Sequence, residues 1–240
     1  MADSVVLYAS PVWGPNAFKR KKNKAKLLKE QRKVAIRITR AYRTVETMAV
    51  IAIAGVVPWP RVISERTRLK QLPALGKKEA REETLREWQN EWCGKPADAP
   101  GSWTRHLIPD LVRWFGRKHG ETTYYLTQVL TGHGCFQKYL HKIHKAPDPR
   151  CITCSTGEVD DVTHTVFVCP ALEEARRRTP EIVSDARTVK GLIAAMLEDE
   201  KSWEQGIRLV GNVFTRKTEL ENERRRRASQ LDMTTREEES

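Results

Sequence analysis

Residues 151–169 read CITCSTGEVDDVTHTVFVC and place three cysteines and one histidine within nineteen residues. Read as ligands, Cys151, Cys154, His164 and Cys169 have the spacing C-x2-C-x9-H-x4-C, a Cys3His set that suits a tetrahedral zinc ion. Four protein ligands leave no position for a water, so the sequence predicts one structural Zn2+ ion. Such binding contributes on the order of 10 kcal/mol, enough to order a segment with few large apolar residues. Reduced structural cysteines are the alternative.

The same stretch contains Asp160 and Asp161, and an acidic pair can hold the two magnesium ions of a polymerase palm. Such a pair requires apolar strands on both sides and further carboxylates upstream. Here the preceding residues are Gly-Glu-Val, and the pair lies in the loop between the two halves of the ligand set. We therefore expect the aspartates to form a turn or to cap the element that carries the histidine.

The composition of the chain narrows the class of protein. Its 240 residues include 43 Lys and Arg against 31 Asp and Glu, and this net charge of +12 is clustered. Clustered positive charge favours nucleic acid or a membrane surface as partner, with simple solubility charge as the alternative. The sequence has no apolar run near the ~20 residues of a membrane span and no signal-peptide pattern after Met1. We expect an intracellular protein with no membrane partner.

Helical periodicity dominates the sequence, and sustained period-two alternation is absent, so the predicted fold class is mainly α. Gly and Pro clusters separate the expected helices, and we expect residues 93–102 to form an internal loop or hinge. The helices are expected at 18–45, 46–57, 61–72, 77–92, 104–115, 121–134, 135–145, 171–178, 188–200 and 202–227. The segment 46–57 is apolar on every side, which indicates a buried helix.

The first long helix has a strongly basic side on which Glu30 is the only acidic residue. A helix with such a stripe can follow the phosphates of a nucleic acid, while a solvated face is the alternative. The candidate nucleic-acid-binding residues are Lys19, Arg20, Lys21, Lys22, Lys24, Lys26, Arg32, Lys33, Arg37 and Arg40. A second basic run, Arg224 to Arg227, suits either nuclear localisation or phosphate contacts.

Other candidate sites are weaker. The patterns GxxxxGK[ST], GxGxxG, HExxH and GxSxG are absent, so the sequence shows no catalytic constellation and no site for a small-molecule substrate. A second metal site or a Cys/His nucleophile would have to use His133, Cys135, His141 and His144. We expect the histidines to be surface residues instead, because no carboxylate orients them and lysines surround His141 and His144. Aromatic residues available for base stacking, or for the core, are Trp103, Trp114, Tyr124 and Tyr125.

Several segments in fixed order resemble a known family. They are ASPVWG (9–14), AYRTV (41–45), AIAGVVP (52–58), GSWTRHLIPDL (101–111), YYLTQVLTGHGCFQKYL (124–140) and the Cys3His stretch ending in HTVFVCP. Together they resemble the C-terminal part of the pol polyprotein of arthropod type-1 (R1-like) non-LTR retrotransposons, from about Tyr8 to about Arg178. In that family the polyprotein joins an endonuclease, a reverse transcriptase with fingers, palm and thumb, and a C-terminal CCHC zinc knuckle.

The resemblance implies a domain organisation. Residues 1–16 would be a remnant after the palm, 17–146 a helical thumb-like region and 147–180 the zinc knuckle. Beyond the resemblance, periodicity predicts C-terminal helices at 181–228, and the polar, uncapped stretch 229–240 predicts a disordered tail. The family's catalytic Tyr-x-Asp-Asp and the metal-binding acids of its endonuclease are absent, so neither enzymatic activity can be assigned to residues of this chain. Only the knuckle ligands carry over, onto the Cys3His set.

The resemblance also implies a role in target-primed reverse transcription. The basic helix would grip an RNA–DNA hybrid, and the knuckle would hold template RNA or target DNA. The expected location is the nucleus, with a cytoplasmic ribonucleoprotein stage. Two alternatives remain open: a stand-alone RNA- or DNA-binding protein derived from such an element, and an interaction scaffold in which zinc only staples helices.

Overall fold

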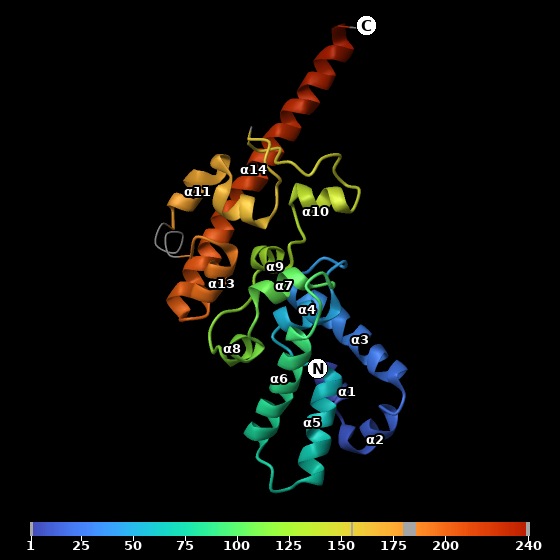
Figure 1. Cartoon of the computed structure of the whole chain (residues 1–240). Helices are drawn as coiled ribbons and strands as arrows, with labels where there is room; N and C mark the ends of the chain where they lie inside the picture. Colours follow the sequence, from blue (N-terminus) through green and yellow to red (C-terminus); the bar gives the residue numbers. More distant parts are fainter. Residues whose placement is uncertain (1, 155, 180–185, 239–240) are drawn as a thin grey trace. The chain divides into compact units, whose positions relative to one another are not determined.

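The computed structural model describes residues 2–154, 156–179 and 186–238 (Figure 1), and the described part is helical, as the sequence predicts. These residues contain no strand, and their one isolated β-bridge pairs Arg150 with Val159. Among the described helices, none combines the length and hydropathy that a membrane span requires. The chain divides into two compact units, with the boundary between His133 and Gly134.

Unit 1, the part up to His133, is built from short and medium helices. They are α1 (Ala2–Val6), α2 (Ser10–Ala17), α3 (Lys21–Thr39), α4 (Thr47–Ile53), α5 (Trp59–Gln71), α6 (Lys77–Cys93), α7 (Ser102–Leu107), α8 (Leu111–Gly116) and α9 (Tyr124–Thr131). The sequence analysis predicts no helix before residue 18, so the structure adds α1 and α2 to the expected helices. Helix α2 packs closely on α5, and Gly14 permits this approach because it has no side chain. A Cβ atom added at Gly14 would lie only 2.4 Å from Ile63 Cγ2 of α5.

The core of unit 1 forms around α4, whose residues from Ala49 to Ile53 are all buried, as the apolar pattern of 46–57 predicts. Trp114 is fully buried, and its indole N–H donates to the carbonyl of Ala52 at 2.8 Å. Gln31 of α3 is also buried, with its amide donating to Val57 O at 2.9 Å and accepting from Trp59 N–H at 2.7 Å. Both ends of that amide are thereby used where α3 meets the start of α5.

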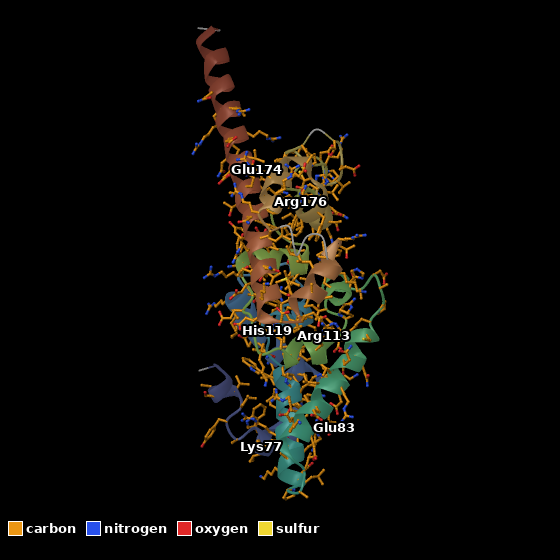
Figure 2. The ribbon with its side chains drawn as sticks, turned by 90° about the vertical axis from the view of Figure 1, so that its left-hand side faces the viewer. Lys77, Glu83, Arg113, His119, Glu174 and Arg176 are labelled. Carbon is orange, nitrogen blue, oxygen red and sulfur yellow. The ribbon has the colours of Figure 1, made fainter. Side chains whose placement is uncertain are left out.

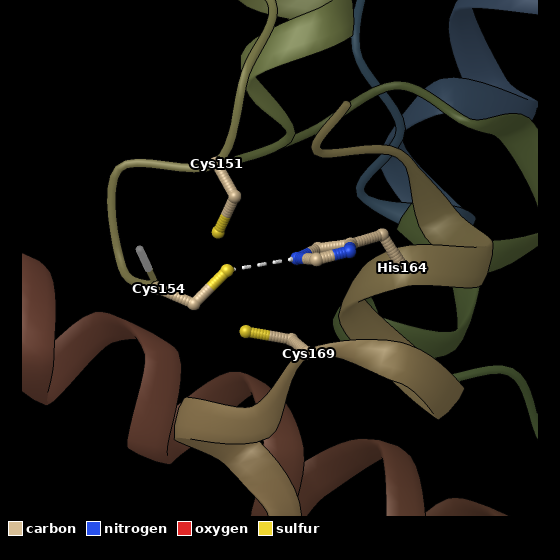
Figure 3. Close-up of side chains that lie close together, drawn as sticks. All are labelled: Cys151, Cys154, His164 and Cys169. Carbon is tan, nitrogen blue, oxygen red and sulfur yellow. Dashed lines mark hydrogen bonds between the residues drawn. The ribbon is translucent and has the colours of Figure 1, made fainter. Parts of the chain in front are cut away.

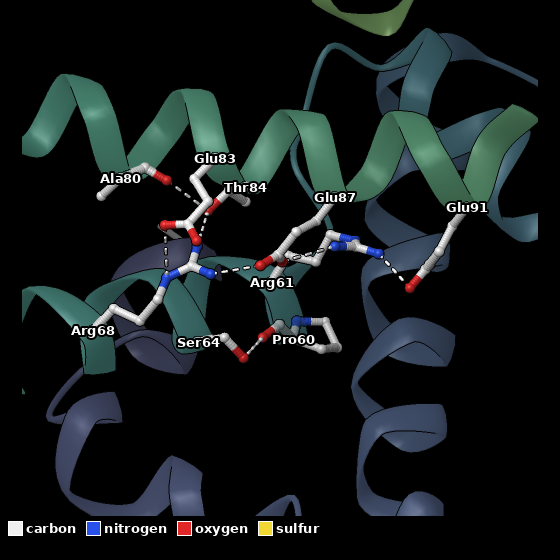
Figure 4. Close-up of polar contacts among 9 residues, drawn as sticks. All are labelled: Pro60, Arg61, Ser64, Arg68, Ala80, Glu83, Thr84, Glu87 and Glu91. Carbon is white, nitrogen blue, oxygen red and sulfur yellow. Dashed lines mark hydrogen bonds and ion pairs between the residues drawn. The ribbon is translucent and has the colours of Figure 1, made fainter.

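Charged side chains join α5 to α6 along one side of the pair (Figure 4). Arg61 contacts Glu87 at 3.3 Å and Glu91 at 2.6 Å, and Arg68 contacts Glu87 at 2.6 Å. Arg68 also donates to the hydroxyl of Thr84 at 2.8 Å. The two arginines are mostly covered, while Glu87 is half-exposed and Glu91 is exposed, so we expect modest stabilisation from each pair.

Unit 2 contains α10 (Gln137–Lys142), η1 (His164–Val168), η2 (Pro170–Leu172), α11 (Glu173–Arg177), α13 (Val189–Met196) and α14 (Glu200–Glu238). The expected parts 147–180 and 181–228 are packed together here, because α14 contacts η1, η2 and α11. Helix α10 also belongs to this unit rather than to the helical region expected at 17–146. The boundary between the two compact units therefore falls inside the region expected at 17–146.

Helix α14 continues through residues 229–238, where the sequence predicts a disordered tail. The stretch after Gly211 contains no Gly or Pro, so nothing in it stops a helix once the packed part has nucleated it. Residues 239–240 of the expected tail lie outside the described residues.

A buried ion pair lies in the core of unit 2. Lys217 of α14 is 1% exposed and places its ammonium 2.7 Å from both carboxylate oxygens of Asp160, which is 0% exposed. The carboxylate also accepts from the Thr165 hydroxyl at 2.7 Å and from the backbone N–H of Gln137 at 2.9 Å. Burial is the largest single influence on the pKa of Lys217 and works to lower it, but the charge and hydrogen bonds of Asp160, together with neighbouring Cys135 and Glu221, outweigh burial and raise the pKa. The ammonium, the hydroxyl and the backbone N–H together satisfy Asp160 in the interior.

Candidate metal centre

The four predicted ligands converge on one point in unit 2 (Figure 3). One donor atom from each of Cys151, Cys154, His164 and Cys169 lies within 4.8 Å of the others. Around a zinc ion with ~2.3 Å bonds to sulfur, tetrahedral ligand atoms stand about 3.8 Å apart, so a small contraction would complete the shell. Three soft sulfurs with one imidazole nitrogen suit zinc chemically. The set can hold one metal ion, as the spacing predicts.

The first two ligands come from a loop whose ends are fixed by backbone hydrogen bonds. Cys151 N–H donates to Glu158 O at 2.8 Å, and Asp160 N–H donates to Pro149 O at 2.9 Å. Gly157 has φ of 74°, a left-handed conformation that glycine adopts without strain. This closed loop turns the Sγ atoms of Cys151 and Cys154 toward the same centre.

The other two ligands come from one helical turn. The backbone N–H of Cys169 donates to His164 O at 2.7 Å, an i to i+5 bond that makes 164–168 a π-turn. Asp161 caps the helical residues 162–163 that lead into η1, since its carboxylate accepts from His164 N–H at 3.1 Å. The predicted N-cap is therefore confirmed for Asp161, whereas Asp160 points into the core. Residues 162–168 of this β-branched stretch are helical rather than extended, and the π-turn brings both ligands to one side.

The site is mostly covered: Cys151, His164 and Cys169 are 8%, 4% and 0% exposed. His164 Nε2 lies 3.4 Å from Cys154 Sγ, so this nitrogen faces the centre, while its buried Nδ1 has no hydrogen-bond partner in the described part of the chain. A hydrogen bond between the Cys151 and Cys169 sulfurs lowers the pKa of Cys151 and raises that of Cys169. Metal binding requires the thiolate forms of both cysteines, so a bound cation would displace their protons.

The structure does not gather the other histidines into a second site. Within the described ranges, the Cys3His set is the one group of side chains that could hold a metal. His133 Nδ1 lies 3.0 Å from the Thr44 hydroxyl, and His141 Nδ1 lies 3.1 Å from Ala146 O. Of the aromatic candidates, Trp114 is core, whereas Trp103 is half-buried and Tyr124 is 38% exposed.

The basic candidates divide by their contacts. Arg32 is half-buried and donates to Val45 O at 2.8 Å, so it holds the chain after α3, and Lys33 pairs with Glu30 at 2.8 Å. The others form no ion pair with the described residues, and most of them are exposed. We call these eight the basic surface: Lys19, Arg20, Lys21, Lys22, Lys24, Lys26, Arg37 and Arg40. Sequence reasoning could not separate Arg32 and Lys33 from them, because a contact with a particular partner depends on the fold.

Sequence reasoning missed the residues that surround the metal centre. Asp160 was expected in a turn, and its partner Lys217 lies 57 residues further along the chain. Arg176, 8% exposed, donates to Cys169 O at 2.7 Å. Burial lowers the pKa of Arg176, an effect that neighbouring Cys169 and Glu173 oppose. The sequence shows Arg176 only as one of three consecutive arginines, so no local signal could have found it.

Comparison with known proteins relates the chain to a retrotransposon protein. The chain is 30% identical over 194 residues to the "Retrovirus-related Pol polyprotein from type-1 retrotransposable element R1 4" of Nasonia vitripennis. The match covers 71% of this chain and 47% of the relative, so the chain spans about half the length of that protein. No family model matches the chain, and no solved structure matches it. The chain is thus a distant homologue of an R1 retrotransposon Pol polyprotein.

Proposed function

We propose that this chain is a nucleic-acid-binding, C-terminal part of a retrotransposon RNA-directed DNA polymerase and acts in target-primed reverse transcription. In this proposal, unit 1 is thumb-like, and the Cys3His set is a CCHC knuckle that holds one structural Zn2+ ion. The partners are RNA, DNA or both, met in the nucleus after a cytoplasmic ribonucleoprotein stage. The chain's own residues bind and position the nucleic acid, and catalysis is supplied by residues outside it.

The observation that carries the proposal is the 194-residue alignment with a retrotransposon Pol polyprotein. A polymerase must hold template and primer, and the alignment covers most of a chain that has a net charge of +12. The cations of the basic surface are available to contact phosphates, because they have no carboxylate partners among the described residues. Unpaired cations of this kind release counterions when they contact phosphates, which drives sequence-independent binding.

The test measures binding of the full chain to labelled single-stranded RNA, single-stranded DNA and an RNA–DNA hybrid across a salt series. We expect log affinity to fall linearly with log salt concentration. The triple variant Lys21→Gln/Lys22→Gln/Lys24→Gln should bind more weakly and should reduce the salt slope by roughly 0.7 to 0.9 for each phosphate that it no longer neutralises. Metal analysis of the same preparations should give one zinc per chain.

A matched control is Lys77→Gln/Lys78→Gln, two exposed lysines at the start of α6. This control should change affinity less than the triple variant does. Equal losses of affinity in the two variants would show that binding depends on the total charge of the chain and not on the basic surface. A zinc-loaded chain that binds none of the three ligands would contradict the function and favour the interaction scaffold.

The link to a polymerase has a separate test in the transcript. Sequencing upstream of the Met1 codon should reveal an in-frame palm with Tyr-x-Asp-Asp. An untranslated leader at that position would instead favour a stand-alone nucleic-acid-binding protein derived from such an element.

A further inference from the structure

The charge of the metal centre needs a counter-charge. Three thiolates and a neutral imidazole around a divalent cation carry a net charge of −1. Of these ligands, Cys169 has no exposed surface, and Cys151 and His164 are nearly covered. A net charge in such surroundings is unfavourable unless an opposite charge or hydrogen-bond donors lie beside it. The fold should therefore place a cation near the sulfurs.

Several cations of unit 2 that are close to the ligands in sequence or in space have carboxylate partners of their own. These pairs are Arg150 with Asp148, Lys217 with Asp160, Arg177 with Glu173 and Arg178 with Glu174. Three of these pairs are solvent-exposed, and the fourth is enclosed in the core. The charge of each of these cations is already balanced by a carboxylate, so none of them offsets the charge of the metal centre.

Arg176 differs from all of them. It lies on α11 with Glu174 (both labelled in Figure 2), yet it forms no ion pair with any residue that the structure describes, and 8% of its surface is exposed. One terminal nitrogen, Nη2, donates to the carbonyl oxygen of the ligand Cys169 at 2.7 Å. The other, Nη1, is buried and has no hydrogen-bond partner in the described chain. A buried guanidinium with an unused donor, attached to a metal ligand, lacks its anion.

We propose that Arg176 is the positioning residue of the metal centre and supplies the positive charge that balances the anionic metal–thiolate cluster. Its bond to the Cys169 carbonyl fixes the end of the π-turn, and so the direction of the Cys169 sulfur. Its charge stabilises the thiolates. This inference rests on the metal-binding part of the proposed function and is independent of nucleic-acid binding.

The test is a zinc competition titration of the full chain against a chromophoric chelator, with Co2+ spectra as a second readout. Removing a group that orients or polarises a ligand typically lowers metal affinity roughly 10- to 100-fold, and we expect this loss for Arg176→Met. Arg176→Lys keeps the charge but not the fork of donors, so it should lose less affinity than Arg176→Met. The matched control is Arg177→Met, the next residue, which is exposed and pairs with Glu173.

Each outcome decides the question. Wild-type zinc affinity in Arg176→Met would overturn the inference, as would a Lys variant as weak as the Met variant, because charge would then be irrelevant. An equal loss in Arg177→Met would also overturn it, since general charge would then be responsible. If Arg176→Met does not fold, the comparison of Arg176→Lys with Arg176→Gln replaces it. Failure of the unmodified chain to bind zinc would show instead that the metal centre itself is wrong.

Discussion

Units 1 and 2 are both helical but have different interiors. In unit 1 the largest fully buried side chains are apolar, among them Trp88, Trp114 and Ile51. In unit 2, Phe136 and Phe214 pack edge to face at 5.7 Å, but the same core also encloses the Asp160–Lys217 ion pair and lies beside the metal ligands. Apolar burial stabilises without exact geometry, whereas buried charges and metal ligands stabilise only with every partner in place. Unit 2 should therefore be the more sensitive to the removal of single groups.

Metal removal should produce the largest difference in stability between the two units. Chelation, or Cys154→Ser, should abolish hydrogen-exchange protection across 150–170, because structural zinc sites contribute on the order of 10 kcal/mol to folding. The amides of α6 in unit 1 should keep their protection. Cys93→Ser, at an exposed cysteine outside the site, is the control and should change neither unit. Unchanged protection in the chelated wild type would show that unit 2 does not depend on metal.

The variant Lys217→Met should have the next largest effect. It leaves the carboxylate of Asp160 buried without its cation, which typically destabilises by about 3 to 5 kcal/mol. Urea denaturation followed by signals from α13 and α14 measures the loss. Arg216→Met, the exposed neighbour that pairs with Glu219, should stay within about 1 kcal/mol of wild type. Adding Asp160→Asn to Lys217→Met should recover part of the loss, and further destabilisation there would argue against an uncompensated charge.

Alkaline pH should weaken unit 2 through Cys135. Burial raises the pKa of this thiol from 9.0 to about 11, so the unfolded chain releases the proton first. The contribution of Cys135 to folding is then constant below about pH 9 and falls by about 2 kcal/mol as pH rises to about 11. Comparison with Cys135→Ala, which lacks this proton, isolates the effect in denaturation curves measured between about pH 8 and 11. Parallel curves would contradict it.

The smallest effect is expected in unit 1. Glu87→Gln removes the carboxylate shared by Arg61 and Arg68 on the α5–α6 pair, but this carboxylate is half-exposed. The loss of stability should be about 1 kcal/mol or less and should shrink in high salt. Thermal unfolding at two salt concentrations measures it, with Glu82→Gln, in a 4.0 Å pair, as the control. A loss above about 2 kcal/mol would mean that unit 1 also depends on precise charge pairing.

How far the sequence predicts each feature depends on the distance over which its signal acts. The four candidate ligands and the N-cap at Asp161 could be predicted from the sequence, because each depends on the spacing of residues that are close together in the chain. The buried helix α4 was readable because its apolar residues cover every side. The helices of 1–17 were missed because α2 contains Gly14 and Pro15 and is held by its packing on α5. A local sequence pattern cannot predict that packing, because α2 and α5 are far apart in the chain.

The sequence by itself determined the fold class, the four residues that could hold a metal ion and the abundance of cations, because periodicity, spacing and composition are local or additive properties. Only the tertiary structure decided which charges have partners. It buried Asp160 against Lys217, turned Arg32 onto backbone carbonyls and placed Arg176 against Cys169. The physical reason is that the energy of a charge depends on its burial and on its neighbours in space, and residues far apart in the chain supply both.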